Sequence, residues 1–493
     1  MIMKKLLIFI SLLCPVLMSS QDWNIEWYGS LRGAGSTGQY MPFWSRTGED
    51  GVLPVTSSGL AAVGMDVSFA DKKGWYFDAG VNLAGAVAKP SQLNSSKVYG
   101  MVDRLYVGGG WRMLHLDVGM RPRQRELSDV SVSGGNFMYS RNARNMPGIN
   151  LWTDWIYFEK GHWFGIKGNI SHYQTIDDRY VSGTLIHNKS LFAKVSLWSK
   201  VELIAGLDHW AQWGGVSPMY GKQPLSVSNY WKVFVAGKGG DDATLSDQVN
   251  VLGNHLGREV LRINWLCQSF TMSLQYDKPF EDGSGMKYKN APDGIWSLQF
   301  LFNDKDAWVT DLVLEYIGTT WQSGPLHDRP ATEEEMKEQD PDGHYYGKIV
   351  LGGCDNYFGN GQYASGWTHD RRIIGLPLII PYAPDASGIV RGVASTRLRG
   401  CHLGLKGVIS RKLPYALKAT YTKNYGRYNQ PATSYFTSEP WQVSLAFETV
   451  IGQRIWDQLP MEVAVGVYGD MGQLYPKSVG LVLKLSYLGS HKF

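Results

Sequence analysis

Five arginines within residues 121–149 are the side chains best suited to binding a charged ligand. They are Arg121, Arg123, Arg125, Arg141 and Arg144. A guanidinium presents a fixed fork of donors that matches carboxylate and phosphate groups, so the cluster suits an acidic sugar polymer. Alternatively, the arginines fold inward and form ion pairs with carboxylates in the interior of the protein. The sequence leaves both interpretations open.

Residues 356–367 form a second candidate binding segment, Asn-Tyr-Phe-Gly-Asn-Gly-Gln-Tyr-Ala-Ser-Gly-Trp. Aromatic faces stack on sugar rings, while amide and guanidinium groups hydrogen-bond to hydroxyl and acidic groups. Polysaccharide contacts are therefore predicted for Tyr357, Asn360, Tyr363, Trp367, Arg371 and Arg372. The alternative is a tightly folded plug, in which glycines supply unusual backbone angles and aromatic rings fill the interior.

Motifs for catalysis are absent from the sequence. It has no Gly-x-Ser-x-Gly elbow, no His-Glu-x-x-His pair, no Walker loop and no convincing Ser/His/Asp set. His209 and His402 are conceivable bases for a serine on a neighbouring strand, as in membrane phospholipases, but a lone histidine in a barrel more often lines the lumen or an interface. We therefore predict that the protein is not an enzyme.

The sequence also predicts no metal site and no cofactor. None of Cys267, Cys354 and Cys401 has another cysteine or histidine at the spacing of a metal-binding motif. The acidic residues of 331–343 are most simply a solvated short helix and turn, with a calcium site as the alternative. The formal net charge of +4 is slight for 493 residues and gives no argument for nucleic acid.

The first twenty residues read as a secretory signal peptide. Lys4 and Lys5 precede an apolar run, 6–18, and small serines follow it. This run is too short to be a confident membrane-spanning helix. We predict a signal peptide over 1–20 and a single mature domain over 21–493.

The rest of the chain shows alternation of apolar and polar residues, which is typical of β-strands. Eighteen strands are predicted, at 24–34, 59–70, 74–88, 98–109, 111–120, 150–159, 162–172, 189–199, 201–213, 256–266, 268–277, 295–303, 308–319, 397–410, 413–425, 441–451, 460–469 and 478–493. Their connections are long after each odd strand and generally short after each even one. This rhythm predicts an all-β fold, a transmembrane antiparallel β-barrel with short periplasmic turns and long extracellular loops.

Aromatic residues support a barrel in the outer membrane. Trp75, Trp111, Trp163, Trp198, Trp265, Trp308 and Tyr415 fall at or near the short connections. Amphipathic rings sit well at the depth of lipid headgroups, so these residues predict an aromatic girdle in contact with outer-membrane lipid. The chain ends on Phe493 after an alternating strand. Such an end resembles the signal that bacterial outer-membrane barrels present to the barrel assembly machinery.

Three stretches carry a resemblance to a known family. They are Asn142–Pro147, Asp247–Gly257, and Tyr357–Trp367 with Ile374–Pro377. They resemble the recurring signatures of Wzi-type capsule assembly proteins, particularly versions from Bacteroides-like bacteria, and the similarity in length and motif order covers essentially the whole mature chain. Gly253-Asn-His-Leu-Gly257 is the most specific stretch, although Arg258-Glu259 follows it where many relatives have a Ser-Tyr-Asp type of continuation.

The resemblance implies an eighteen-stranded outer-membrane barrel with an occluded lumen. Such a protein acts as a lectin-like anchor that keeps exported capsular or extracellular polysaccharide on the cell surface. From their position in a loop, Asn254 and His255 join the candidate polysaccharide contacts. The alternative function is a substrate-specific porin for anionic solutes or saccharides, in which the arginines form a basic track through an open lumen. Both interpretations predict the same topology.

Overall fold

The computed structural model describes residues 23–91, 98–158, 161–324, 329–330, 332–334, 349–350, 355–428, 430–431, 433–451 and 460–492. The signal peptide predicted over 1–20, most of the acidic segment 331–343 and the terminal Phe493 lie outside these residues. Among the described residues, no helix is long and apolar enough to cross a membrane.

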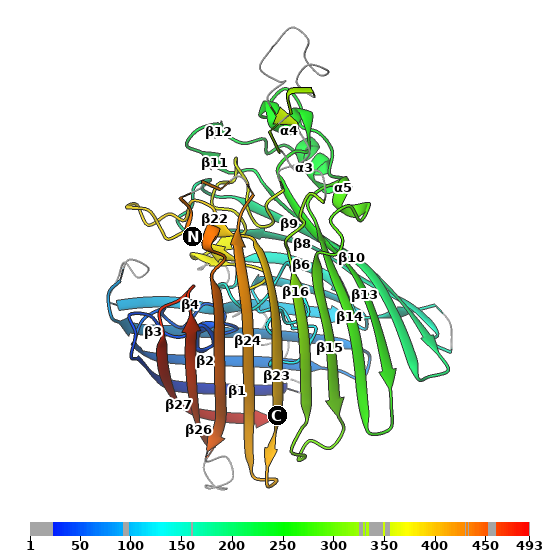
Figure 1. Ribbon diagram of the computed structural model, residues 1–493. Helices are drawn as coiled ribbons and strands as arrows, with labels where there is room; N and C mark the ends of the chain where they lie inside the picture. The colour runs from blue at the N-terminus through cyan, green and yellow to red at the C-terminus, as the bar shows by residue number, and fades with distance from the viewer. Residues whose placement is uncertain are drawn as a thin grey trace.

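The chain forms a closed antiparallel barrel of eighteen strands, which confirms the predicted fold class (Figure 1). The strands are β1 (Trp23–Ser36), β2 (Ser58–Ala70), β3 (Trp75–Ala88), β4 (Val98–Trp111), β5 (Leu114–Met120), β6 (Gly148–Thr153) with β7 (Ile156–Tyr157), β8 (Phe164–Gln174), β9 (Leu185–Leu197), β10 (Val201–Trp213), β13 (Asn254–Leu266), β14 (Phe270–Phe280), β15 (Gly294–Phe302), β16 (Asp311–Gly318), β23 (Arg397–Ile409), β24 (Leu413–Gly426), β25 (Trp441–Ile451), β26 (Met461–Gly472) and β27 (Ser478–Lys492).

The barrel closes where its first and last strands meet. β1 and β27 pair from Asn24 opposite Lys492 to Ser36 opposite Gly480. Closure leaves no strand edge with unpaired backbone groups, a requirement for any sheet that spans hydrocarbon. One predicted strand, 150–159, is interrupted, because β6 and β7 pair separately with β8.

The period-two pattern separates an outer from an inner face. In β27, Val479, Leu481, Leu483 and Leu485 are exposed outside, while Ser478, Gly480 and Val482 are buried. Val482 breaks the polar pattern of the inner face because it packs against apolar residues within the lumen. The tryptophans assigned to the girdle are exposed near the short connections, as Trp75 (57%) and Trp308 (63%) illustrate.

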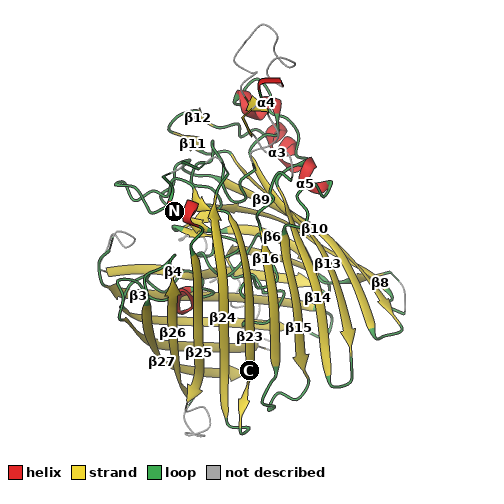
Figure 2. Ribbon diagram, in the orientation of Figure 1, coloured by secondary structure: helices red, strands yellow, loops and turns green. Residues whose placement is uncertain are grey.

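The long connections carry the remaining elements. Helices α3–α5 stand above the long-loop end of the barrel, while α2 lies within it (Figures 1 and 2). These elements are α2 (Phe43–Arg46), β11 (Val216–Ser217), β12 (Gly221–Lys222), α3 (Val227–Phe234), α4 (Leu245–Val249), α5 (Gly283–Met286), β17 (Arg329–Pro330), β18 (Ile349–Val350), β19 (Thr368–His369), β20 (Arg372–Ile373), β21 (Ile380–Pro381), β22 (Val393–Ser395) and the 3-10 helix η2 (Tyr435–Ser438).

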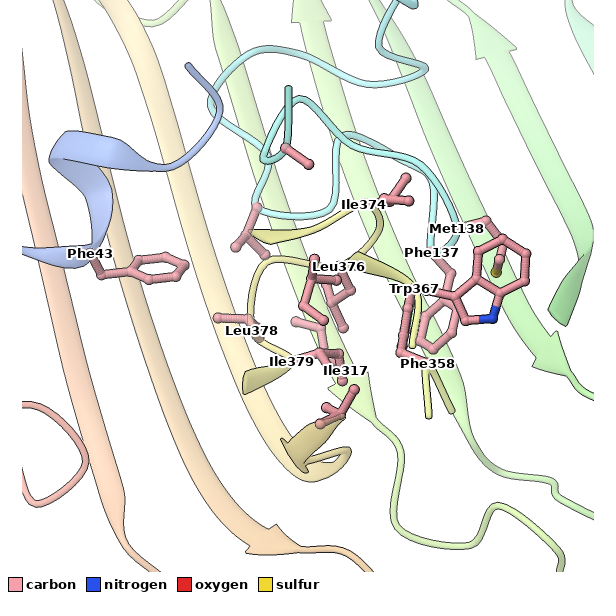
Figure 3. Close-up of a cluster of buried hydrophobic side chains, with 14 of the residues drawn as sticks. Phe43, Phe137, Met138, Ile317, Phe358, Trp367, Ile374, Leu376, Leu378 and Ile379 are labelled. Carbon is pink, nitrogen blue, oxygen red and sulfur yellow. The ribbon is translucent and has the colours of Figure 1, made fainter. Parts of the chain in front are cut away.

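Three loops, 37–57, 121–147 and 355–396, enter the lumen and build an apolar core there, which we call the plug core. Its loop members include Met41, Phe43, Trp44, Leu53, Phe137, Met138, Tyr357, Phe358, Trp367, Ile374 and Leu376. Its wall members are Ala34, Tyr173, Ile186, Trp210, Leu256, Ile295, Ile317, Leu398, Ala446, Tyr468 and Val482, which come from β1, β8–β10, β13, β15, β16, β23 and β25–β27. Figure 3 shows Phe137, Phe358 and Trp367 close together inside the wall. The predicted occlusion of the lumen by loops is therefore confirmed.

The plug core predicts a large effect for one truncation. Phe358 is fully buried, and its ring centroid lies 5.0 Å from that of Phe137. Phe358→Ala should lower the free energy of unfolding by about 3–5 kcal/mol, because it removes buried apolar surface and leaves a cavity. Urea unfolding in detergent measures this free energy. The matched control is Phe158→Ala, because Phe158 is 61% exposed. An equal effect at both positions would contradict the plug core.

Candidate functional site

Three of the five predicted arginines are paired within the protein. Arg121 contacts Asp78 at 2.6 Å and Asp117 at 2.5 Å on the barrel wall. Arg141 forms a two-pronged contact with Asp50, and this carboxylate raises the pKa of Arg141 above its usual value. Arg144 donates to the carbonyl of Val102 at 2.6 Å and lies 3.7 Å from Asp370. These contacts match the inward-folded alternative.

Arg123 and Arg125 also point into the barrel, but neither has a carboxylate within ion-pair distance among the described residues. Arg123 lies over the rings of Tyr173 and Trp210, 5.4 and 4.7 Å from their centroids, and donates to Asn188 Oδ1 at 2.7 Å. Arg125 donates to the carbonyl of Gly48 at 2.8 Å. Burial lowers the pKa of Arg125, and the nearby Arg141 lowers it further.

Arg258 fastens the plug loop 121–147 to the wall. This guanidinium is 1% exposed, lies 2.8 Å from Asp277 and 3.2 Å from Asp208, and also pairs with Glu126 of the loop. It further donates to the carbonyl of Gly135 at 2.9 Å. Because a buried charge is costly without partners, the three carboxylates and Arg258 require one another. Arg258 is not among the site residues predicted from the sequence, although Asp208 is its direct register partner on the neighbouring strand.

The predicted aromatic contacts lie in or against the plug. Tyr357 and Trp367 belong to the plug core, and their exposed fractions are 0% and 1%. The Tyr357 hydroxyl donates to Asp293 Oδ2 at 3.2 Å and accepts from Asn290 at 2.7 Å. Tyr363 is 3% exposed, and its hydroxyl donates to the carbonyl of Gly214. In this structure, therefore, these rings are covered by protein.

The two arginines after this segment are both partly buried. Arg372 donates to the carbonyls of Arg46 at 2.8 Å and Leu53 at 2.6 Å. Burial lowers the pKa of Arg372 to about 10, and Arg46 contributes. Arg371 is partly exposed. Arg372 thus helps to hold the plug loops together.

Three predicted site residues, Asn254, His255 and Asn360, meet at a cavity of about 790 Å³ among the long loops. We call this cavity the outer pocket. Its lining includes Tyr220, Lys222, Gln223, Asp242, Asp247, Asn250, Glu281, Gly361 and Gln362. Asn254 donates to Gln212 at 2.8 Å, and His255 lies 2.9 Å from His209. None of the predicted arginines lines it.

Hydrogen bonds fix the shape of the outer pocket. Gln362 donates to Gln223 at 2.6 Å and to Asp247 at 3.1 Å, and accepts from Thr244 at 3.0 Å. Thr244 also caps α4 by accepting from the backbone N–H of Asp247. Gln362 therefore joins the loop before β13 to the plug loop 355–396. It lies within the quoted segment 356–367, but nothing in its spacing distinguished it from its neighbours.

The lining of the outer pocket contains more carboxyl groups than ammonium groups. Three carboxyl groups, Asp242, Asp247 and Glu281, face one ammonium group, Lys222. Burial raises the pKa of Asp247, and burial with the neighbouring Asp355 raises that of Glu281. Among the described residues, no group of three or more His, Cys, Asp or Glu side chains is placed to hold a metal ion. The pocket instead offers amide, hydroxyl and carboxyl groups suited to sugar hydroxyls.

The two histidines considered for catalysis are engaged elsewhere. His402 Nε2 lies 2.7 Å from the carbonyl of Val130, and its Nδ1 lies 2.8 Å from Thr420 Oγ1. His209 contacts His255. Neither contacts a serine hydroxyl in the part of the chain that the structure describes. The geometry thus offers no serine nucleophile beside either base.

Comparison with solved structures supports the fold. Wzi, an outer-membrane protein described as involved in group 1 capsule assembly in Escherichia coli and as a carbohydrate-binding β-barrel, aligns with a TM-score of 0.54. The alignment has 14% identity and covers 93% of this chain and 83% of Wzi. At this identity the likeness establishes a shared fold alone.

More distant similarities add no functional argument. The crystal structure of OccAB4 from Acinetobacter baumannii aligns with a TM-score of 0.46 and 10% identity, over 96% of this chain and 99% of that chain. No protein-family model matches the sequence, and no curated protein matches it significantly.

Removal of the central guanidinium should loosen the plug. Arg258→Met leaves three carboxylates without their partner and should lower the free energy of unfolding by about 3–5 kcal/mol at neutral pH. The control is Arg411→Met, because the side chain of Arg411 is 77% exposed. This substitution should change the free energy of unfolding by less than about 1 kcal/mol. Urea unfolding of both variants makes the comparison.

The effect of Arg258→Met should also depend on pH. Burial opposes ionisation of Glu126, yet Arg258 and Arg262 outweigh it and lower the pKa of Glu126. A lowered pKa stabilises the folded state above the unfolded value of about 4.3, and this stabilisation disappears as the pH falls through the folded value. The difference between wild type and variant should therefore shrink on acidification. A difference that grows below pH 4 would contradict the assignment.

Proposed function

We propose that this protein is an outer-membrane barrel that binds a capsular or extracellular polysaccharide through the outer pocket. The single observation that carries the proposal is the position of a polar cavity of about 790 Å³ at the long-loop end, above a lumen filled by the plug core. Its volume falls within the range of about 300–1,000 Å³ common for ligand sites. Wzi, described as a carbohydrate-binding barrel, has a similar fold and supports the proposal.

The proposal includes an orientation in the membrane. The long loops face the cell exterior, and the short turns with both chain ends face the periplasm, as is usual for barrels with an even number of strands. The exposed tryptophans near the short connections then meet outer-membrane lipid at headgroup depth. The signal peptide over 1–20 directs export, and the barrel assembly machinery inserts the mature domain.

The charge of the outer pocket selects among polymers. Carboxyl groups outnumber ammonium groups in its lining. We therefore infer a neutral or amine-bearing saccharide at this pocket rather than the acidic polymer that the arginine cluster indicated. Recognition then depends on hydrogen bonds to hydroxyl groups, with no role for Arg121, Arg141 or Arg144, which pair inside the barrel.

Filling the pocket tests the proposal. Gly361 lines the outer pocket, and a Cβ added there meets no atom within 4 Å. Gly361→Leu should therefore fold normally but reduce affinity for the organism's purified surface polysaccharide at least tenfold, a change of about 1.4 kcal/mol. Titration calorimetry in detergent measures the affinity.

The matched control is Gly283→Leu. Gly283 lies in α5 at the same end of the barrel, also has open space around its Cβ, and does not line the pocket. This variant should bind like wild type. Equal binding by wild type, Gly361→Leu and Gly283→Leu would show that the polysaccharide does not bind in the outer pocket.

Ion conductance separates the anchor from the porin. The plug core spans the lumen from wall to wall, so purified protein in planar lipid bilayers should show no steady open pore. A stable conductance under the same conditions would favour the porin interpretation. A second observation disfavours the porin. Arg121 and Arg141 form ion pairs with Asp78, Asp117 and Asp50, so they are not free to form a basic track.

A further inference from the structure

A second cavity, of about 470 Å³, lies inside the barrel between the wall strands β5, β6, β8–β10 and β13 and the plug loop 121–147. We call it the inner pocket. Trp152 and Thr153, the last residues of β6, line it, and so does Lys167 near the start of β8. All three lie at the strand ends that adjoin short connections. The lining also extends to Gly119, Gly148 and Tyr173, at strand ends next to the long loops, and Tyr173 belongs to the plug core as well.

The plug loop forms the other side of the inner pocket. Its contribution includes Arg121, Pro122, Arg123, Gln124, Arg125, Glu126, Asn136 and Tyr139. The pocket is therefore separated from the outer pocket by the plug. Solvent reaches its lining, because the side chain of Arg121 is 30% exposed and that of Glu126 25%.

Cations outnumber carboxylates in the lining of the inner pocket. The cations are Arg121, Arg123, Arg125, Lys167, Arg258 and Arg262, and the carboxylates are Asp117, Glu126 and Asp208. Asp78 and Asp277 neutralise Arg121 and Arg258 from outside the lining. With these two carboxylates included, six cations face five carboxylates, an excess of one positive charge. Arg123, Arg125 and Lys167 are the cations for which no ion pair occurs within the described residues.

A neighbouring cavity shows that this imbalance is local. About 600 Å³ of the same lumen, on the β1–β4 and β24–β27 side, is lined by Arg32, Arg104, Arg125, Arg141, Lys418 and Lys484 together with Glu49, Asp50, Asp103, Asp129, Glu448 and Glu462. Cations and carboxylates balance there. We call it the balanced cavity.

Lys167 is the cation of the inner pocket for which neither a hydrogen bond nor an ion pair occurs among the described residues. Its ammonium group lies 5.1 Å from the ring centroid of Trp155 and 5.2 Å from that of Phe192. Within the described part of the chain, no oxygen accepts a hydrogen bond from it. An ammonium has three donors, so Lys167 can bind an anionic group without breaking an existing ion pair.

The other groups of the inner pocket suit a saccharide. Its lining combines aromatic rings, among them Trp152, Tyr139 and Phe192, with the amides of Asn136, Asn150, Asn169 and Gln124. Rings of this kind cover sugar faces, and amides bond to hydroxyl groups. We propose that the inner pocket binds a short anionic saccharide bearing a carboxylate, with Lys167 as its anionic-group contact. This site is distinct from the outer pocket and takes the opposite class of sugar.

Trigalacturonate, a trisaccharide with three carboxylates, is the probe, and neutral maltotriose is its counterpart. The detergent-purified protein should bind trigalacturonate more tightly than maltotriose by titration calorimetry, and added salt should weaken the binding. Lys167→Gln should weaken trigalacturonate at least fivefold, and Lys167→Arg, which keeps the charge, should retain most of the affinity. The Lys167→Arg result separates loss of charge from loss of fold.

Lys484→Gln provides the matched control. Lys484 lines the balanced cavity, and no ion pair occurs for it among the described residues. Its removal should leave trigalacturonate binding unchanged, as should Gly361→Leu in the outer pocket. Equal binding of both sugars, an equal loss in Lys484→Gln, or a loss only in Gly361→Leu would overturn the proposal. The last outcome would show that the acidic sugar binds in the outer pocket instead.

Discussion

The structure depends on contacts made inside a barrel between loops that are distant in sequence. Arg258 holds three carboxylates and the carbonyl of Gly135, and thereby fixes loop 121–147 against β10, β13 and β14. The plug core in addition joins three loops to β1 and to strands between β8 and β27. An eighteen-stranded barrel without such filling would enclose a wide aqueous channel. Because the plug fills the lumen, it separates the long-loop end of the barrel from the short-turn end.

This closure determines where ligands can bind. The outer pocket lies among the long loops, where Gln362 joins two of them, and the inner pocket lies between the wall and loop 121–147. The two pockets differ in charge, since carboxyl groups dominate one lining and cations the other. If both proposals hold, the protein binds a different class of saccharide at each pocket.

Local patterns in the sequence were enough to predict the wall but not the site. Strand identity depends on neighbours two residues apart, so β24 and β27 could be read directly, including the outward Leu481 and Leu483. The direction of Arg141 depends instead on Asp50, ninety-one residues away in the chain. The burial of Tyr357 and Trp367 likewise requires Phe137 from another loop and wall residues from many strands. Composition could suggest glycan contacts or a plug, and only the spatial arrangement distinguished them.

The central claim is that the outer pocket retains polysaccharide at the cell surface. The most direct measurement is the partition of polysaccharide between cells and medium in a strain that lacks the gene and carries wild type, Gly361→Leu or Gly283→Leu on a plasmid. We expect every strain to make normal amounts of polysaccharide. Cells with wild type or Gly283→Leu should retain it, and cells with Gly361→Leu or the empty plasmid should shed it into the medium. Full retention in the strain with the empty plasmid would contradict it.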